Sequence, residues 1–174
     1  QEMIANYSTT EENTWDVSAN GDGSVIATLS DDGILTISGE GNMKNWKRTY
    51  YSSDWHKNKG KVIKIVIEEG VTNIGDNAFE DCSRLTRISI PSSVTSIGDG
   101  AFYCAESLKK VNIPEGVTSI GDEAFRKCIG LVSANIPSRV ETVGSNAFNA
   151  CRNLININIS EGVTKIGEYA FLNC

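Results

Sequence analysis

Apolar and polar positions follow one pattern that recurs five times in this chain, each copy beginning 23 residues after the previous one. Each copy opens with Val, carries Gly four positions later and closes on Ala-Phe, as in VTSIGDEAF from Val117 to Phe125. The copies begin at Val71, Val94, Val117, Val140 and Val163. A constant period of roughly 20 to 50 residues is typical of solenoids, in which each repeat is one coil that buries its apolar residues against its neighbours. The pattern therefore predicts a solenoid.

Within one repeat, the spacing of apolar residues indicates two short strands and a turn of helix. Residues 111–113 alternate apolar and polar side chains, as half-buried strands do, and Pro114, which has no amide hydrogen to donate, ends this strand. A second extended stretch is expected over residues 117–120, before Gly121, a residue that adopts a positive φ at little cost. Residues 122–128 then carry the phenylalanine of the repeat inward on one helical turn. We therefore expect a mainly β structure with short helical turns.

The first part of the chain does not repeat, but its pattern also indicates strands. Apolar and polar residues alternate in the segments TWDVSA, SVIATLS and GILTISG, and the turn at residues 31–33 predicts a β-hairpin between the last two. A terminal coil without a cover would expose its core and an unpaired strand edge. We therefore expect residues 1–61 to form an N-terminal β cap, and residues 62–174 to form a solenoid of about five repeats, the last one incomplete.

The aromatic residues of the cap allow two interpretations. All three tryptophans lie in this segment, together with the only histidine. They either plug the end of the solenoid core or form an exposed patch that grips a sugar or a protein. The segment between Trp46 and Trp55 is polar enough for a surface loop, so both interpretations stay open.

Polar residues between the buried positions of the first strand should form outward columns along the solenoid. One column is expected to hold Ser89, Asn112, Asn135 and Asn158, and the other Lys64, Arg87, Lys110, Ser133 and Asn156. Such a face either only solvates the sheet or binds a ligand. Short polar side chains held in register lose little freedom on binding, so this face is the first candidate ligand site. The candidate residues are Lys110, Asn112, Asn135, Asn156 and Asn158, with Trp46 and Trp55 as the competing site.

Charge and hydropathy argue against two classes of partner. The chain carries 22 acidic and 16 basic residues, a net charge of −6, whereas nucleic-acid binding needs clustered Lys and Arg. No apolar stretch approaches the ~20 residues that cross a bilayer, so we expect no membrane insertion by this segment.

Residues that could carry chemistry are few. Four of the five cysteines share one column (Cys82, Cys128, Cys151 and Cys174), and Cys104 stands one position early in its repeat. The sequence has no C-x-x-C pair, the spacing that would suggest a zinc site. Neighbouring column cysteines would lie within disulfide range, but parallel side chains favour buried free thiols. His56 has no partner motif for nucleophilic catalysis. We therefore predict no catalytic, metal-binding or cofactor-binding residue, and no enzyme.

The repeats resemble the BspA-like family of leucine-rich repeats, whose 23-residue unit carries the pattern I-G-x-x-A-F-x-x-C-x-x-L. The resemblance covers residues 62–174, with residues 62–67 as the tail of a sixth copy. It implies a right-handed leucine-rich-repeat solenoid and a secreted or cell-surface location, since the family is associated with surface proteins and adhesion in bacteria and some protists.

The function that this resemblance implies is a non-enzymatic binding or adhesion module, which presents a rigid solenoid face to a protein or glycan partner and needs no cofactor. The alternative is a structural stalk or spacer within a larger surface protein. The opening residues lack the basic and apolar regions of a signal peptide, and the last repeat stops within a coil. From the first observation, either the protein is cytosolic or a signal was removed before this sequence begins. From the second, we expect either a longer protein or a last coil whose edge is covered by another component.

Overall fold

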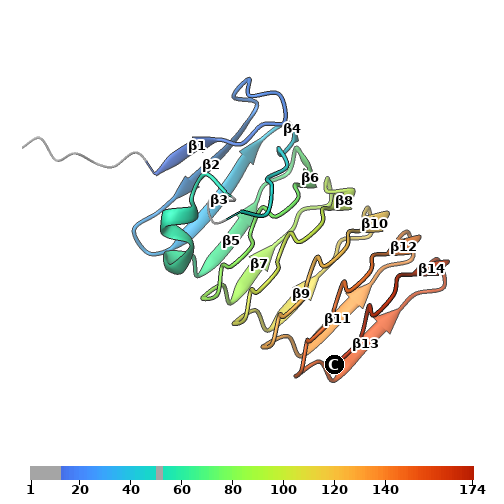
Figure 1. Ribbon diagram of the computed structural model, residues 1–174. Coiled ribbons are helices and arrows are strands. Elements are labelled where there is room, and N and C mark those ends of the chain that lie inside the picture. Colours follow the sequence, from blue (N-terminus) through green and yellow to red (C-terminus); the bar gives the residue numbers. More distant parts are fainter. Residues whose placement is uncertain (1–12, 50–52) are drawn as a thin grey trace, which may run out of the picture.

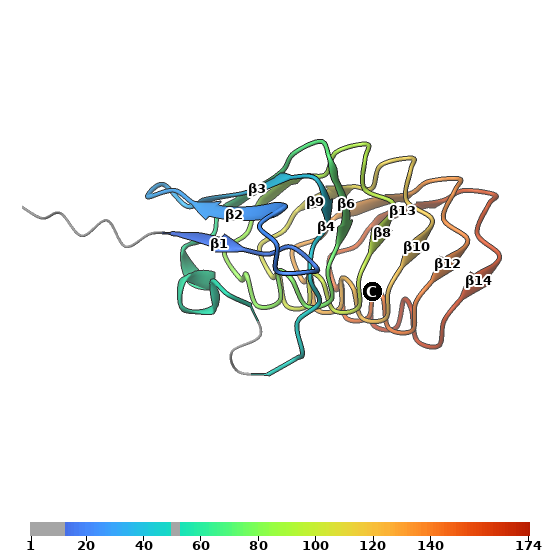
Figure 2. The same cartoon turned by 90° about the horizontal axis from the view of Figure 1, so that it is seen from above.

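The computed structural model describes residues 13–49 and 53–174, which form a stack of coils covered at the N-terminal end by a β-rich cap (Figure 1). Seen from above, the coils follow one another along a single axis, with the cap strands beside the first of them (Figure 2). In the part of the chain that the structure describes, the one helix is a short 3₁₀ helix, η1, at His56–Lys61. The expected mainly β solenoid with an N-terminal cap is confirmed.

The cap is an antiparallel sheet that continues into the solenoid. It consists of β1 (Thr14–Asp16), β2 (Val25–Leu29) and β3 (Ile34–Gly39). The predicted hairpin is confirmed, since β2 pairs antiparallel with β3 and Gly33 of the turn has a φ of +83°. β3 also pairs in parallel with β5 (Lys64–Ile67), the first strand of the repeats. The edge of the first coil is therefore hydrogen-bonded to the cap instead of being open.

Two ladders of parallel strands run along the solenoid. The first ladder consists of β5, β7 (Arg87–Ser89), β9 (Lys110–Asn112), β11 (Ser133–Ile136) and β13 (Asn156–Ile159). The second consists of β4 (Gly41–Asn42), β6 (Val71–Ile74), β8 (Ser96–Ile97), β10 (Ser119–Ile120), β12 (Thr142–Val143) and β14 (Lys165–Ile166). The second ladder is one continuous six-stranded sheet, whereas the first is interrupted between β7 and β9.

The third side of each coil consists of turns instead of the expected helical turn. Glu123 and Lys127 have φ values of +57° and +60°, and a left-handed residue ends a right-handed helix. The alternation of conformations points peptide groups along the solenoid axis. The amides of Glu123 and Phe125 consequently donate to Ser145 O at 2.8 Å and Ala147 O at 2.7 Å in the next coil. The expectation of a helix over residues 122–128 was wrong, because bonds between coils replace bonds within a helix.

The glycine that recurs in every repeat is required for a different reason from the one expected. Gly121 does not have a positive φ. A Cβ atom added to Gly121 would lie 2.6 Å from the amide nitrogen of Asp99 and 2.7 Å from the carbonyl carbon of Gly98. The coils approach each other so closely here that only glycine fits.

The core is a set of stacked columns, of which the phenylalanine column is the largest. Phe79, Phe102, Phe125 and Phe148 have no exposed surface. The ring centroids of Phe102 and Phe125 lie 5.1 Å apart with planes at 6°, and those of Phe125 and Phe148 lie 5.1 Å apart with planes at 11°. Their placement in the interior, which the sequence predicts, is confirmed.

Candidate ligand-binding site

The outward residues of β5, β7, β9, β11 and β13 form one polar surface, which we call the strand face. Successive residues of a strand point to opposite sides, so the residues between the buried Val, Leu and Ile positions face solvent. Strand pairing places Lys110, Ser133 and Asn156 in one row across β9, β11 and β13, and Asn112, Asn135 and Asn158 in another. The five strand-face residues predicted from the sequence are therefore all exposed on adjacent strands.

Asparagine side chains interact along the strand face. The Nδ2 group of Asn158 donates a hydrogen bond to Oδ1 of Asn135 at 2.9 Å. This bond orients both carboxamides but leaves further donor and acceptor positions on each amide for a ligand. The column is thus a preorganised row of neutral hydrogen-bonding groups.

A pocket opens on the strand face where the first ladder is interrupted. We call it the strand-face pocket; it has a volume of ≈ 400 Å³ and is lined by Lys64, Thr86, Arg87, Ile88, Ser89, Lys109, Lys110 and Asn112. Ile88 beneath it is half-buried, whereas the corresponding Val111 is only 1% exposed. The interruption therefore exposes part of the core at this step.

Hydrogen bonds between coils show how the pocket arises. The amide of Thr86 donates to Ile63 O at 2.9 Å, and the amide of Val132 donates to Lys109 O at 3.0 Å. The equivalent bond from Lys109 to Thr86 is missing from the described part of the chain. Like charges on adjacent strands weaken pairing, and Arg87 and Lys110 occupy neighbouring positions at this step. Lys64 and Arg87 are paired in the same way in the intact part of the ladder, so charge repulsion alone does not account for the opening.

Four basic residues surround the pocket without acidic partners. Lys64, Arg87, Lys109 and Lys110 form no salt bridge with any carboxylate of residues 13–49 and 53–174. The sequence prediction included only Lys110 of these four. The sequence predicts Lys64 and Arg87 in the same outward column as Lys110 but not as ligand contacts; a basic residue at this position in three successive repeats was the signal that would have added them.

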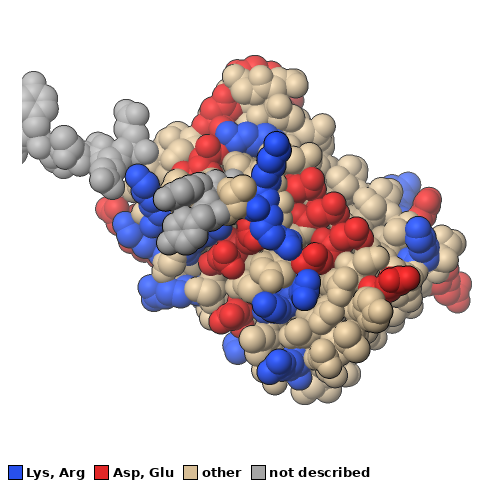
Figure 3. Space-filling view, viewed as in Figure 1, with Lys and Arg blue, Asp and Glu red and all other residues tan. Residues whose placement is uncertain are grey.

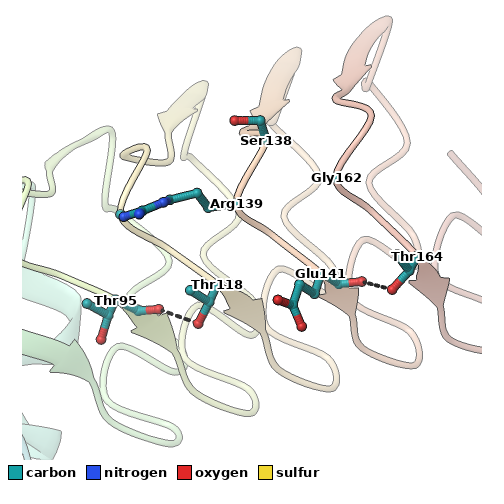
Figure 4. Close-up of a pocket in the computed structure, with 8 residues that line it drawn as sticks. Thr95, Thr118, Ser138, Arg139, Glu141, Gly162 and Thr164 are labelled. Atoms are coloured by element: carbon teal, nitrogen blue, oxygen red, sulfur yellow. Dashed lines mark hydrogen bonds between the residues drawn. The ribbon is translucent and has the colours of Figure 1, made fainter.

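A second groove lies on the side of the second ladder (Figure 4). It has a volume of ≈ 650 Å³, and its floor is a column of Thr95, Thr118, Glu141 and Thr164. The Oγ1 group of Thr118 donates to Thr95 O at 3.3 Å, and that of Thr164 donates to Glu141 O at 3.2 Å. Because their hydroxyl protons are already used within the ladder, these threonines offer a ligand mainly acceptor positions. Arg139 and Glu141 add one charge of each sign to the lining of this groove.

Charges on the turn side are paired with one another. Arg48, from the segment that follows the cap, contacts Glu80 through Nε at 3.0 Å and Glu123 through Nη1 at 2.9 Å. Its guanidinium also lies 4.2 Å from the ring centroid of Tyr103. Partial burial alone would raise the pKa of Glu123, but hydrogen bonds from Arg48 and Arg126 outweigh it, and the pKa is lowered. Basic and acidic side chains lie next to each other on this side (Figure 3), so this cluster braces the first coils.

The repeated aspartates of the turn side also have a structural role. Oδ1 of Asp76 accepts the amide of Asp99 at 2.8 Å, and Oδ1 of Asp99 accepts the amide of Asp122 at 2.8 Å. Burial raises the pKa of Asp99, and the neighbouring carboxylates of Asp76 and Asp122 raise it further against the effect of this amide bond. Each carboxylate thus links one coil to the next.

One tryptophan of the cap lies in the core, and the other two pack against it. Trp55 has no exposed surface, and its ring lies 5.4 Å from Trp46 and 5.8 Å from Phe79 between centroids. The interpretation that the aromatics plug the core is confirmed for Trp55, and its assignment as a ligand-contacting residue was wrong because no ligand reaches a fully buried ring. Trp46 is half-buried, and its indole N–H donates to Asp54 at 3.2 Å. Residues 50–52, within the same predicted loop, lie outside the described residues.

The cysteines are free thiols in the structure. The thiol of Cys128 donates to Phe102 O at 3.2 Å, and that of Cys151 donates to Phe125 O at 3.1 Å. Burial raises the pKa of Cys82 to about 12 and that of Cys151 to about 12. These thiols are therefore protonated packing residues. Within residues 13–49 and 53–174, no group of three or more His, Cys, Asp or Glu residues could hold a metal ion.

Solved structures with similar folds come from bacteria. A leucine-rich cell surface protein of Faecalibacterium prausnitzii A2-165 is 27% identical, with a TM-score of 0.61 over 88% of this chain and 51% of that chain. The leucine-rich repeat protein of T. pallidum is 21% identical, with a TM-score of 0.55 over 85% of both chains. A leucine-rich repeat protein of Eubacterium ventriosum ATCC 27560 is 24% identical, with a TM-score of 0.51 over 91% of this chain and 63% of that chain.

Sequence identity and coverage decide what each similarity supports. The T. pallidum and E. ventriosum proteins share the fold, and the present chain spans about half of the F. prausnitzii protein. No curated protein sequence matches the chain. Across the described ranges, no helix is both long and apolar enough to cross a membrane.

The repeats themselves match a family profile. The profile of the BspA type leucine-rich repeat region matches residues 49–174 in six copies, in agreement with the five copies and the tail of a sixth that the sequence shows. Since the match covers well over half of the chain, the protein belongs to the BspA type leucine-rich repeat family.

Proposed function

We propose that this chain is a non-enzymatic binding module of a bacterial cell-surface protein, and that it binds a protein or glycan partner on the strand face. The observation that carries the proposal is the exposed set of polar side chains on adjacent strands, Lys110, Asn112, Asn135, Asn156 and Asn158. Strands in a hydrogen-bonded ladder hold these groups in place, so binding costs little ordering entropy.

Two further observations support this function. The relative from F. prausnitzii is described as a cell surface protein, which fits a module that meets partners outside the cell. The buried thiols, the paired carboxylates of the turn side and the aspartate row are all engaged in packing or hydrogen bonds. An enzymatic site would need a reactive group left available in a cleft, so binding is the better proposal.

The alternative proposal is a stalk or spacer. Hydrogen bonds between coils run along the turn side as well as the second ladder, and such a stack is stiff along its axis. A stiff stack that binds nothing would hold another domain at a distance.

A binding screen with two matched variants tests the proposal. The wild-type chain is applied to protein and glycan arrays, followed by a triple variant with Asn112→Ala, Asn135→Ala and Asn158→Ala. The control carries Thr95→Val, Thr118→Val and Thr164→Val in the other groove. We expect the asparagine variant to lose the partner and the threonine variant to keep it, with both still folded.

The opposite results identify other functions. Loss of the partner in the threonine variant alone would place the site in the groove of Figure 4. The absence of any partner on either array would contradict the binding proposal and favour the spacer.

A further inference from the structure

We infer that the strand-face pocket binds an anionic sugar residue, one that carries a sulfate or carboxylate group, within a polysaccharide. The inference rests on the proposed binding function and assigns a ligand class to one part of the same face. The pocket is the part of the strand face where Lys64, Arg87, Lys109 and Lys110 gather around a hollow of ≈ 400 Å³.

The charge of the pocket is opposite to that of the protein. The whole chain carries a net charge of −6, yet none of the outward residues of β5, β7, β9, β11 and β13 is acidic. The four cations of the pocket also lack salt bridges to carboxylates of the described residues. Unneutralised cations that line a concave site attract anions and raise their local concentration.

The arrangement of the cations suits a ligand that repeats along the solenoid axis. Lys64 and Arg87 are paired across adjacent strands, and Lys110 occupies the same position in the next repeat. The paired strands of Lys64 and Arg87 lie about 4.8 Å apart, and Lys110 follows across the opening between β7 and β9, so three cations stand in a row. The repulsion within this row is relieved when an anion lies over it.

Neutral groups beside the cations match the hydroxyls of a sugar. Thr86, Ser89 and Asn112 line the pocket together with the basic residues, and the asparagine row of β11 and β13 continues from Asn112. A sugar polymer with an acidic group and several hydroxyls on each unit would use both kinds of group. Pockets between roughly 300 and 1,000 Å³ are typical of small-ligand sites, and this one is at the lower end, as a sugar-sized group requires.

An acidic protein segment fits the pocket less well. Protein interfaces rely on a few buried aromatic or arginine anchors; no aromatic residue lines the pocket, and its arginine, Arg87, is exposed and not buried. Extended peptides commonly add a strand to the open edge of a sheet. The coils that carry β7 and β9 each have another coil on both sides, so neither strand lies at an end of the stack (Figure 1). The face therefore offers side-chain groups to a polar polymer and little to a peptide backbone.

Direct binding measurements with charged and neutral polysaccharides test this inference. The intact chain is titrated with dextran, dextran sulfate and hyaluronan, and with poly-L-glutamate as an acidic peptide. We expect binding to dextran sulfate, to hyaluronan or to both, and none to dextran; the comparison of the two charged polymers separates sulfate from carboxylate recognition. Binding should weaken as salt increases. Tighter binding to poly-L-glutamate than to either charged polysaccharide would overturn the inference.

Charge-removing variants locate the site. Arg87→Gln with Lys110→Gln should weaken binding about tenfold, as expected for two ionic contacts at a partly exposed site. Lys47→Gln with Lys165→Gln removes the same net charge from exposed positions outside the pocket and should leave the affinity nearly unchanged. Equal losses in both variants would show that only net charge matters and would overturn the inference.

This experiment is independent of the array test of the proposed function. If no charged polysaccharide binds while the asparagine variant still loses an array partner, the anionic-sugar inference fails and the binding function stands. If an acidic polysaccharide binds through Arg87 and Lys110, both are supported.

Discussion

The indole ring of Trp55 stacks on Phe79, with ring centroids 5.8 Å apart and planes at 23°. Trp55 thus extends the phenylalanine column by one member beyond the first repeat, using a residue that does not belong to the repeat pattern. An end coil would otherwise expose the face of Phe79 to water. The cap therefore stabilises the solenoid through ring stacking as well as through the strand pairing of β3 with β5.

Removing this ring should destabilise the whole stack. We expect Trp55→Ala to lower the free energy of unfolding by about 3 to 5 kcal/mol, the range found when large buried aromatic residues are truncated. Urea denaturation followed by circular dichroism measures the change. A variant as stable as the parent would show that the cap does not seal the core.

A conservative substitution separates stacking from hydrogen bonding at the same position. The indole Nε1 of Trp55 is buried and has no hydrogen-bond partner in the described part of the chain. Trp55→Phe keeps an aromatic ring and removes an unsatisfied donor, so its cost should be much smaller than that of Trp55→Ala.

The phenylalanine column should show the same dependence on burial. Phe125 is fully buried between two stacked rings, and Phe125→Ala should cost about 3 to 5 kcal/mol. Among the described residues Phe171 stacks on one ring, that of Phe148, and it is half-buried, so Phe171→Ala should cost clearly less. Thermal and urea unfolding of the pair provide the comparison; equal losses would contradict the burial gradient.

Close approach of the coils makes the glycine column sensitive to one added carbon. Gly121→Ala would force a Cβ atom within 2.6 Å of the Asp99 amide nitrogen, and we expect a loss of about 1 to 3 kcal/mol or more, as in other overpacked cores. Gly60→Ala is the control, since a Cβ atom there meets nothing within 4 Å. Unfolding free energies of both variants should therefore differ.

Buried thiols predict a loss of stability at alkaline pH. Burial raises the pKa of Cys82 from its ordinary 9.0 to about 12. Between these values the unfolded chain has released the thiol proton and the folded chain has kept it, so the unfolded state binds fewer protons and stability falls as pH rises. The contribution is fully present below about pH 9 and declines by up to about 1.4 kcal/mol per pH unit for this thiol.

Alanine at this position isolates the thiol contribution. Ala105 occupies the place of Cys82 in the next coil and is fully buried, so the fold accommodates alanine there. Cys82→Ala should flatten the decline of the unfolding free energy between pH 9 and 11 when it is measured by urea titration. An unchanged slope would assign the alkaline loss to other groups.

Alkylation should distinguish the cysteines by burial. Cys174 is exposed, and Cys82, Cys128 and Cys151 are buried with raised pKa values caused first by burial. Because the thiolate is the reactive form, we expect iodoacetamide to modify Cys174 in the native protein and the three buried thiols only in denaturant. Mass spectrometry identifies the sites, and a Cys128–Cys151 disulfide would contradict the structure.

The features that the sequence predicted correctly are those set by short-range alternation and by the repeat. The hairpin around Gly33 follows from its turn residues and from the alternation of apolar and polar residues on either side. The inward position of Phe125 follows from its place in a sequence motif that recurs at a constant spacing. Both depend on neighbouring residues or on an exact copy of the same environment. The outward asparagines follow from the same alternation, although their role in binding stays a proposal.

Other features depend on contacts between coils, which no single repeat contains. Gly121 is required by the backbone of the preceding coil and not by its own φ, and the segment around Glu123 forms turns because its amides bond to the next coil. Trp55 is buried because the cap folds back onto Phe79. The strand-face pocket exists because one ladder opens between β7 and β9, where an unbroken 23-residue period predicts continuous pairing. Packing and hydrogen bonds between coils determine these features, so only the tertiary structure decides them.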